Sequence, residues 1–429
     1  MCGVYCHIVS TFNRVIFREN FLRRRNCLRR RAGGSRWAAR IFVVMDGYDV
    51  IVVGAGIFGS CTAYHCQKRG LRTILIEQFN LGHKNGSSHG MSRIIRYAHT
   101  EPEYVPLVRD AYQQIAALER KIGESLWKRT GLLWVSKPEE ITSISKILHD
   151  FNIEHETISG EEVGFRYPQF SFGNNWAALI DPEGGVLYAD KWLRTFQDEF
   201  ISLGGTILEN EEVLSYSETD DIVKVTTSKC VFHSKKVIFT VGPWLRRLFP
   251  DLPLQIQPES IAVCYWKAAR SEDAALLEGG KFPVFIAHSD GGLPFGFYGL
   301  PAVDYAGCAK ICFHSGEHID GPTHPENVCQ EFIDHPAEFI REHMPILDSS
   351  APAQIDRCKY TVSEDNHYVI GHYQEAKNVL IGGGCSGSGF KVAPGIGRAL
   401  SQMAANEKPS IDISFFSFDR FQKSKQQLV

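Results

Sequence analysis

The stretch from residue 48 to residue 78 limits the possible folds of this chain most strongly. An apolar, β-branched run at 50–53 suits a buried parallel strand, and a turn with three glycines follows it directly. A helix over 60–69 and a second strand over 73–76 come next, and the unit ends on the acidic residue Glu77. This order matches the dinucleotide-binding fingerprint in its complete context, whereas an isolated glycine triplet is usually an ordinary loop. The stretch therefore predicts nucleotide binding and leaves FAD and NAD both open.

The glycines of the turn have separate tasks. Gly54 turns the chain, Gly56 lets the backbone approach a pyrophosphate, and Gly59 lets the helix pack on the strand. The helix N-terminus offers unpaired N–H groups and a partial positive charge to the phosphates. Glu77 is placed to accept hydrogen bonds from an adenosine ribose.

Charge is distributed unevenly along the 429 residues. Residues 1–44 hold ten arginines, no lysine and one acid, a net charge of +9, so the remaining 385 residues carry −12 of the chain's total of −3. The acidic body argues against nucleic-acid binding. The Arg-rich leader, which we expect to be unstructured, has two explanations: a mitochondrial-type presequence, or a true start at Met45. We favour the second, because two triple-arginine clusters spoil a clean amphipathic face.

The cysteine content and hydropathy of the chain point to an intracellular, soluble protein. Its twelve cysteines are scattered, without a Cys-x-x-Cys pair or histidines at zinc-finger spacing, so we expect reduced thiols and no metal site. No apolar run approaches the ~18–20 residues of a membrane span. The length suggests about two to three domains.

A segment rich in small residues follows Glu77. Within residues 86–96 we expect Ser87 and Ser88 to allow close approach to the cofactor, while His89, Arg93 and Arg96 supply positive charge beside it. The alternative is a solvated loop, because most arginines lie at the surface.

The rest of the chain predicts a mixed α/β fold with two domains. Helical periodicity over 104–122 gives one buried face, and Asp190 is placed to cap a second helix. A strand that ends in glycine near 241 indicates a return to the nucleotide-binding sheet. We therefore predict a discontinuous Rossmann-type domain and a second, substrate-binding domain. Their expected boundaries are 45–125, 186–247 and 357–411 for the first, 126–185 and 248–356 for the second, and 412–429 for a C-terminal tail.

Residues 250–357 have the texture of an antiparallel sheet that covers the cofactor. Short β-rich runs at 260–266 and 295–300 are separated by turn residues. In the predicted strand 309–314, Lys310, Cys312 and His314 share one face. A lysine on a strand usually points at water, whereas one that faces a cofactor beside a histidine is functional, and the sequence leaves both interpretations open.

A second glycine-rich segment lies near the C-terminus. Residues 382–389 contain five glycines, among them Gly387 and Gly389, and precede a helix that Pro394 would start well. The glycines let a cofactor ring come close to the backbone and to the helix dipole. A flexible solvent loop is the alternative, which we discount because Phe390 and Lys391 lead directly into an amphipathic helix.

Four motifs, taken in order, resemble those of the family of monomeric sarcosine oxidase and peroxisomal L-pipecolate oxidase. The resemblance extends from residue 48 to about residue 421. Its motifs are Gly-Ala-Gly-Ile-Phe-Gly at 54–59, Gly-Ser-Ser-His-Gly-Met-Ser-Arg-Ile-Ile-Arg at 86–96, Cys-Lys-Tyr-Thr at 358–361 and Ser-Gly-Ser-Gly-Phe-Lys at 386–391. The resemblance implies FAD rather than NAD, attached covalently through a thioether to the cysteine that matches, Cys358.

The resemblance also implies roles for individual residues. Arg96 and Lys391 match the pair that holds a substrate carboxylate, for which a guanidinium fork and an ammonium group are natural receptors. Lys310 matches the lysine that helps the reduced flavin to react with oxygen, where a cation stabilises developing negative charge. The remaining matches are pocket residues, Tyr298 and His314, and groups near the flavin ring, Arg93 and His89.

One position departs from the family pattern. Ser388 stands where the family usually has histidine, which should widen the pocket and puts sarcosine in doubt as the preferred substrate. The resemblance further implies a peroxisomal location, with cytoplasm and mitochondrion as alternatives, because the last five residues lack a clean Ser-Lys-Leu-like ending.

We therefore expect an FAD-dependent oxidase of a secondary amino acid, sarcosine or L-pipecolate, that forms an imine and reduces oxygen to hydrogen peroxide. We expect a small-molecule substrate, no nucleic-acid or membrane partner, and a monomer. The alternatives are a flavin dehydrogenase of the same fold with another electron acceptor, and a non-catalytic nucleotide-binding protein.

Overall fold

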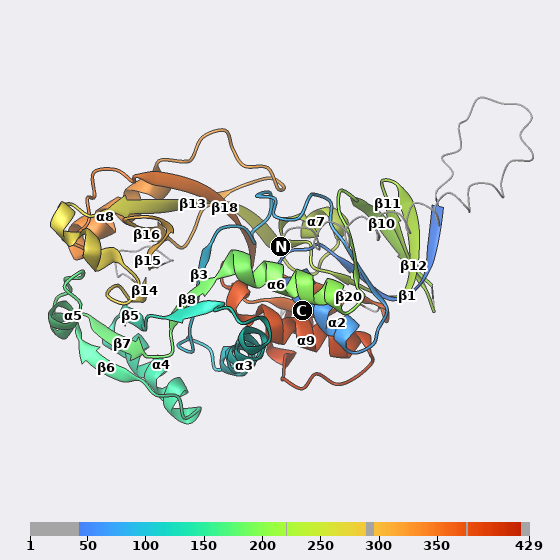
Figure 1. Ribbon diagram of the computed structural model, residues 1–429, viewed down its shortest axis with the longest axis horizontal. Coiled ribbons are helices and arrows are strands. Elements are labelled where there is room, and N and C mark those ends of the chain that lie inside the picture. Colours follow the sequence, from blue (N-terminus) through green and yellow to red (C-terminus); the bar gives the residue numbers. More distant parts are fainter. Residues whose placement is uncertain (1–42, 220, 289–295, 375, 422–429) are drawn as a thin grey trace, which may run out of the picture. The chain divides into compact units, whose positions relative to one another are not determined.

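Parallel strands from three separate segments of the chain form the centre of the first sheet (Figure 1). β1 (Val43–Val53) pairs in parallel with β2 (Thr73–Ile76) and, on its other edge, with β12 (Cys230–Phe239). β2 continues to β9 (Thr206–Leu208), and the end of β12 pairs with β20 (Val379–Gly383). This is the discontinuous Rossmann-type arrangement that the sequence predicts. The computed structural model describes residues 43–219, 221–288, 296–374 and 376–421.

Three antiparallel strands extend this sheet. β11 (Val223–Thr227) pairs with the start of β12, and β10 (Val213–Glu218) pairs with β11. β19 (Val369–His372) pairs with β20.

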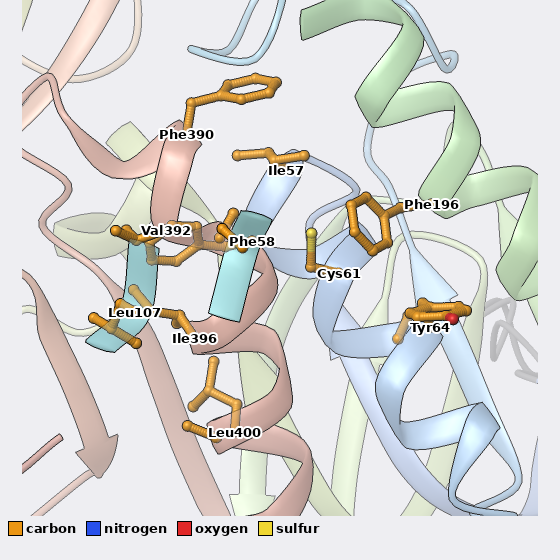
Figure 2. Packing of buried hydrophobic residues seen from close by; sticks show 14 of the residues in the cluster. Ile57, Phe58, Cys61, Tyr64, Leu107, Phe196, Phe390, Val392, Ile396 and Leu400 are labelled. Atoms are coloured by element: carbon orange, nitrogen blue, oxygen red, sulfur yellow. The ribbon is translucent and has the colours of Figure 1, made fainter. Parts of the chain in front are cut away.

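Helices pack around the glycine-rich turn. α2 (Ile57–Lys68) packs directly against α9 (Ala393–Ala404) and α6 (Ala189–Ser202). A side chain at Gly397 would come within 2.7 Å of the Cys61 backbone, so this glycine permits the close approach of α2 and α9. Figure 2 shows the apolar core that results, with residues of α2 facing residues of α6, α9 and α3 (Tyr104–Ile122). The residues labelled in it are Ile57, Phe58, Cys61, Tyr64, Leu107, Phe196, Phe390, Val392, Ile396 and Leu400.

The second sheet has nine strands and is antiparallel except where β5 pairs with β14. Its strands are β5 (Leu132–Ser136), β6 (Glu156–Ser159), β7 (Ala177–Asp181), β13 (Ile256–Lys267), β14 (Val284–Ala287), β15 (Phe297–Tyr305), β16 (Cys308–Phe313), β17 (Glu317–His318) and β18 (Gln354–Ser363). α4 (Pro138–Asp150) contacts β5 and β7, α8 (Glu331–His343) contacts β13 and β16, and α5 (Gly160–Arg166) follows β6.

A three-stranded sheet consists of β3 (Ser92–Ile95), β8 (Gly185–Tyr188) and β4 (Trp127–Arg129). One short helix, α7 (Leu245–Leu248), follows β12. Among the described residues, no helix has both the length and the apolar character needed to cross a membrane.

The structure confirms the predicted fold class and the predicted bounds of α3 and β2. Three expectations need correction. α2 begins at Ile57, inside the glycine-rich turn, rather than at residue 60. Asp190 does not cap α6, because the helix already starts at Ala189 and the Asp190 side chain lies at a cavity wall instead. Residues 92–95 form a strand rather than part of a loop.

Strand pairing also revises one domain boundary. Residues 357–363 belong to β18, which pairs along its length with β13 in the second sheet, whereas we expected them in the nucleotide-binding domain. The other boundaries stay a prediction, since residues 43–429 form one compact unit. The leader at 1–42 and the end of the tail at 422–429 lie outside the described residues.

Candidate active site

A cavity of about 600 Å³ lies at the ends of the central parallel strands. The fingerprint turn, Glu77, residues 81–90 and the second glycine-rich segment line it. A methyl group at Gly59 would lie 1.8 Å from the Gly54 carbonyl oxygen, so the turn and α2 pack as closely as the fingerprint requires. This cavity brings together all but one of the residues that we predicted to bind the cofactor: Gly54, Gly56, Glu77, Ser87, Ser88, Cys358, Gly387 and Gly389. Gly59 does not line it and instead packs against Gly54 and Thr240.

Glu77 and Ser88 hold the turn in shape. Glu77 is buried, and its two carboxylate oxygens accept hydrogen bonds from the backbone N–H groups of Ala55, at 2.8 Å, and Phe79, at 3.0 Å. Each oxygen has further acceptor capacity, so these bonds leave room for a ribose hydroxyl. The Ser88 hydroxyl accepts a bond of 3.0 Å from the N–H of Ile57, at the start of α2. Ser88 therefore caps the helix end that was expected to face the phosphates.

Gly387 is required by its neighbours rather than by a ligand. Its φ of +76° disfavours other residues, and a Cβ atom there would lie 2.5 Å from the Tyr360 ring and 2.6 Å from His314. The glycine thus lets the second glycine-rich segment lie against these two rings at the wall of the cavity.

A second cavity, of about 170 Å³, shares part of its wall with the first. Residues that line both cavities are His89, Gly90, Arg93, Cys358, Tyr360, Gly387 and Phe390. The sulfur of Cys358 lies 3.9 Å from Nη2 of Arg93 and 3.8 Å from the carbonyl oxygen of Ser87. Cys358 therefore lies at the junction of the two cavities, where the ring end of a dinucleotide in the larger cavity would meet a substrate in the smaller one.

Arg93 and His89 make the junction of the two cavities suitable for a polar ring. Arg93 donates hydrogen bonds to the carbonyl oxygens of Ser87, His89 and Ser92, at 2.7–3.1 Å, and so fixes the segment before β3. Burial and the nearby Arg93 lower the pKa of His89 to about 4, so its imidazole is neutral near pH 7. Its Nε2 atom is buried without a hydrogen-bond partner in the described part of the chain. A buried polar atom without a partner is costly, so a polar group of a bound ring is an expected partner.

Arg96 and Lys391 face the smaller cavity together. The Lys391 side chain is almost fully buried and donates to the carbonyl oxygen of Ser388 at 2.8 Å. Arg96 donates to the carbonyl oxygen of Ala98, and its guanidinium lies over the Trp134 ring. Burial, reinforced by Arg96, holds the pKa of Lys391 well below its usual value, and burial lowers the pKa of Arg96 to about 10. Within the described residues, no carboxylate forms an ion pair with either side chain.

Lys310 lies on β16, and its ammonium group also lines the smaller cavity. It is buried and forms an ion pair of 2.9 Å with Asp304. Of the two interpretations that the sequence left open, the structure therefore agrees with a lysine that faces a cavity, and the functional role of Lys310 stays a prediction.

The predicted pocket residues Tyr298 and His314 lie in the same wall, with their rings edge to face at 5.9 Å. His314 contacts Tyr360, whose hydroxyl is 3.2 Å from Nδ1. Burial lowers the pKa of His314 to about 4 and raises the pKa of Tyr360, so the imidazole and the phenol are both neutral near pH 7 and share this hydrogen bond. This pair gives the cavity a neutral, hydrogen-bonded wall.

Sequence reasoning missed the roles of four other residues: Trp134 and His288 line the smaller cavity, and Asp304 and Glu140 contact residues of its wall. Asp304 pairs with Lys310, and Glu140 accepts hydrogen bonds from Trp134 at 2.9 Å and pairs with His288 at 2.7 Å. A repeating period identifies buried faces but not which acid reaches which cation, so these partners follow only from the tertiary structure.

The chain is similar to known FAD-dependent oxidoreductases. The family of FAD-dependent oxidoreductases matches residues 49–403. A Caenorhabditis elegans protein named "Putative sarcosine oxidase" is 56% identical over 88% of this chain and 99% of its own length. "Peroxisomal sarcosine oxidase" of Mus musculus is 36% identical, over 88% and 97%. "Monomeric sarcosine oxidase" of a Bacillus species is 31% identical, over 87% and 96%.

A solved structure supports the fold. NikD, described as an unusual amino acid oxidase essential for nikkomycin biosynthesis, superimposes with a TM-score of 0.74 at 21% sequence identity. The match covers 87% of this chain and 98% of NikD, so the same architecture extends through nearly all of both proteins.

Proposed function

This chain belongs to the family of FAD-dependent oxidoreductases, and on that premise we propose that it is an oxidase of a secondary amino acid. Its relatives support an oxidoreductase that acts on the CH–NH group of an amino acid. The finer proposal is that the substrate is N-methylglycine or a cyclic amino acid such as L-pipecolate, and that oxygen is the electron acceptor and is reduced to hydrogen peroxide.

One observation carries the proposal: Arg96 and Lys391 face one small cavity and have no carboxylate partner among the described residues. A buried cation without a counter-ion is costly, and a ligand that brings a carboxylate removes that cost. A guanidinium and an ammonium group are suited to grip such a carboxylate from two directions. The substrate acid group is therefore held at the end of the cavity formed by Arg96 and Lys391.

The larger cavity would hold FAD through the fingerprint turn, Glu77 and the second glycine-rich segment, with the flavin ring at the junction near Cys358 and Arg93. When bound, FAD supplies the acceptor for two electrons from the substrate. The residues of the chain supply orientation, because a carboxylate fixed by two cations sets the position of the neighbouring carbon and nitrogen.

The protonation state of the substrate follows from the same charges. The reactive form of the amine is neutral, and nearby cations disfavour its ammonium form. The neutral imidazole of His314 and the buried rings of Tyr298 and Tyr360 form an adjacent wall that adds no further positive charge. In the net reaction the CH–NH group loses two electrons and two protons, oxygen takes them up as hydrogen peroxide, and water can hydrolyse the C=N bond.

Peroxide release tests the whole proposal. Purified protein is supplied with sarcosine, L-pipecolate, proline and N-methylated amino acids, and with the matching amines that lack a carboxylate. We expect peroxide with at least one secondary amino acid and at least about a hundredfold lower kcat/KM for its decarboxylated analogue, because charge-assisted hydrogen bonds to the acid are lost. Flavin-loaded protein that releases no peroxide with any of them contradicts the proposal.

Two alternatives are separated by one variant. In Lys310→Met, an oxidase loses reactivity with oxygen while anaerobic reduction by the substrate persists. A dehydrogenase of the same fold would show full turnover with an artificial acceptor in both proteins and little with oxygen in either. A non-catalytic nucleotide-binding protein would show no reduction in any assay.

We also propose that Cys358 is the covalent attachment point of FAD. Its sulfur lies at the junction of the two cavities, where the ring would lie, beside the Arg93 guanidinium. Acid precipitation tests this: the wild-type pellet should keep the flavin colour, and the pellet of Cys358→Ser should lose it. A colourless wild-type pellet would exclude covalent attachment while leaving FAD binding intact.

The cellular setting is proposed by analogy. The mouse relative is named as peroxisomal and the Bacillus relative as monomeric, and we propose both properties for this chain. Fluorescence microscopy of the tagged chain and light scattering of the purified protein test them.

A further inference from the structure

Asp304 lies beside Lys310 because β15 is irregular at that point. Leu300 on β15 lies opposite Lys310 on β16, yet Tyr305 lies opposite Cys308, so five steps along β15 match only two along β16. With a regular register, Asp304 would lie beyond Cys308, away from Lys310. Bulges of this kind re-aim side chains, and here the bulge brings the Asp304 carboxylate to Lys310.

The contacts form a closed set of three groups. The Lys310 ammonium lies 2.9 Å from Oδ2 of Asp304 and donates to the Ser92 hydroxyl at 2.6 Å. Ser92 donates to the same oxygen of Asp304. The other Asp304 oxygen accepts the N–H of Met91 at 3.1 Å, so the carboxylate is held by β3 as well as by Lys310.

All three groups are shielded from water, so their interactions are strong. The side chains of Lys310 and Asp304 are 5% and 6% exposed, and Ser92 is buried. An ion pair in such a place is only weakly screened, whereas one partner left alone is a costly buried charge. The arrangement thus holds Lys310 in one position and favours its charged form.

The groups around Lys310 differ in sign. Among the described residues, the acid in contact with it is Asp304, while Arg93 on β3 is a cation whose charge opposes that of the ammonium. The Tyr265 ring on β13 lies 5.4 Å from the Lys310 ammonium. Cys312 lies on β16, two residues after Lys310. Burial and Arg93 lower the pKa of Lys310, and Asp304 opposes this effect.

We propose that Asp304 and Ser92 are positioning residues that keep Lys310 protonated and aimed at the junction of the two cavities. The inference rests on the proposed oxidase function, in which the Lys310 cation favours electron transfer to oxygen. Without the carboxylate, Lys310 loses its proton at a lower pH and is no longer held in place.

The first test uses no enzyme turnover. The free energy of unfolding is measured in urea for wild type, Asp304→Asn, Lys310→Met and the double variant. If the pair is coupled, each single variant is destabilised and the double variant is less destabilised than the sum, because no isolated buried charge remains. Additive effects would overturn the inference.

The second test measures the two half-reactions against pH. At alkaline pH we expect Asp304→Asn to slow the aerobic step, reoxidation by oxygen, about tenfold more than the anaerobic step, reduction by the substrate. The rate of the aerobic step should also begin to decline at a lower pH than in wild type. The size of the effect follows because one unit of pKa is a tenfold change in protonation. Ser92→Ala should show a smaller loss in the same direction. Asp356→Asn is the matched control: it removes a carboxylate from the same cavity wall that bonds to Tyr305 and not to Lys310.

The outcomes separate the two proposals. If Lys310→Met keeps the aerobic step unchanged, the proposed role of Lys310 is wrong. If Lys310→Met abolishes that step and Asp304→Asn leaves its pH profile where wild type has it, only the positioning role is wrong. A purely structural role for Asp304 would lower stability without moving the profile.

Discussion

The guanidinium carbon of Arg96 lies 4.8 Å from the centre of the Trp134 ring, at the wall of the smaller cavity. The indole N–H of Trp134 donates to Glu140 at 2.9 Å, and Glu140 also accepts the Ser136 hydroxyl at 3.0 Å. Glu140 therefore fixes the Trp134 ring over which the Arg96 guanidinium lies. A guanidinium stacked on an aromatic face is held in one plane and keeps its N–H groups free for a ligand.

Replacing Trp134 should weaken the carboxylate site in two separable steps. Trp134→Leu removes the ring, and we expect about a tenfold loss of affinity for a carboxylate ligand, from a cation–π contact of about 1–2 kcal/mol. Trp134→Phe keeps a ring and loses the bond to Glu140, so the loss should be about two- to threefold. Titration followed through the flavin absorbance measures both, and equal losses would contradict the role of the ring.

The affinity for a carboxylate ligand should fall as pH rises through the pKa of Lys391. Burial and Arg96 lower this pKa in the free protein, and a bound carboxylate raises it again. Between the pKa of Lys391 in the free protein and its higher pKa in the complex, binding of the carboxylate takes up a proton. In that pH range the affinity falls by up to about tenfold per pH unit.

A carboxylate without an amino group is the suitable ligand for this measurement, because its own charge is constant over the range. Calorimetry in two buffers of different ionisation heat reports the proton uptake directly. Lys391→Met should bind more weakly with a flat pH profile, and a sloping profile in that variant would assign the titration to another group.

A methyl group at Gly59 should prevent cofactor binding. It would lie 1.8 Å from the Gly54 carbonyl oxygen and 2.5 Å from the Thr240 hydroxyl, so α2 must move away from the turn. We expect Gly59→Ala to purify with less than about a tenth of the wild-type flavin or to fail to fold, as overpacking against backbone predicts. Gly86→Ala, whose added methyl meets only an ordinary contact at 3.5 Å, should retain its flavin.

Ser388 should contribute to stability through Tyr368. The Tyr368 ring is fully buried, and its hydroxyl bonds to that of Ser388 at 2.8 Å. Ser388→Ala leaves a buried hydroxyl without this partner, and we expect a loss of about 1–3 kcal/mol in the free energy of unfolding. The double variant with Tyr368→Phe removes the stranded hydroxyl and should recover part of it. Urea unfolding of the three variants measures these free energies. A double variant that is no more stable than Ser388→Ala alone would contradict the role of the hydrogen bond between Ser388 and Tyr368.

The sequence predicted those secondary-structure elements that depend on residues close together in the chain. The fingerprint predicted the order of β1, α2 and β2 because glycines and β-branched residues act within a few positions, although β1 and α2 begin earlier than expected. The helical period gave the bounds of α3. The family resemblance connected Arg96, Lys310, Cys358 and Lys391, which lie far apart in the sequence, and the structure places all four at the smaller cavity. Periodicity could not have connected them.

Non-local pairing decided the rest. β18 joins the second sheet through β13, and no feature within residues 354–363 shows which strand will pair with it. No pattern in the sequence connected Asp304 with Lys310, since only the irregular pairing of β15 brings the two side chains together. Asp190 had the sequence of a cap, but Ala189 already lies in the helix.

The pairing of β18 with β13 runs without interruption from Ile256 to Tyr265, with Cys358 opposite Ile261 near its middle. This pairing fixes the backbone that carries the Cys358 sulfur. In the proposed covalent attachment the flavin ring must therefore come to the cysteine, so that entry of the cofactor into the larger cavity precedes formation of the bond.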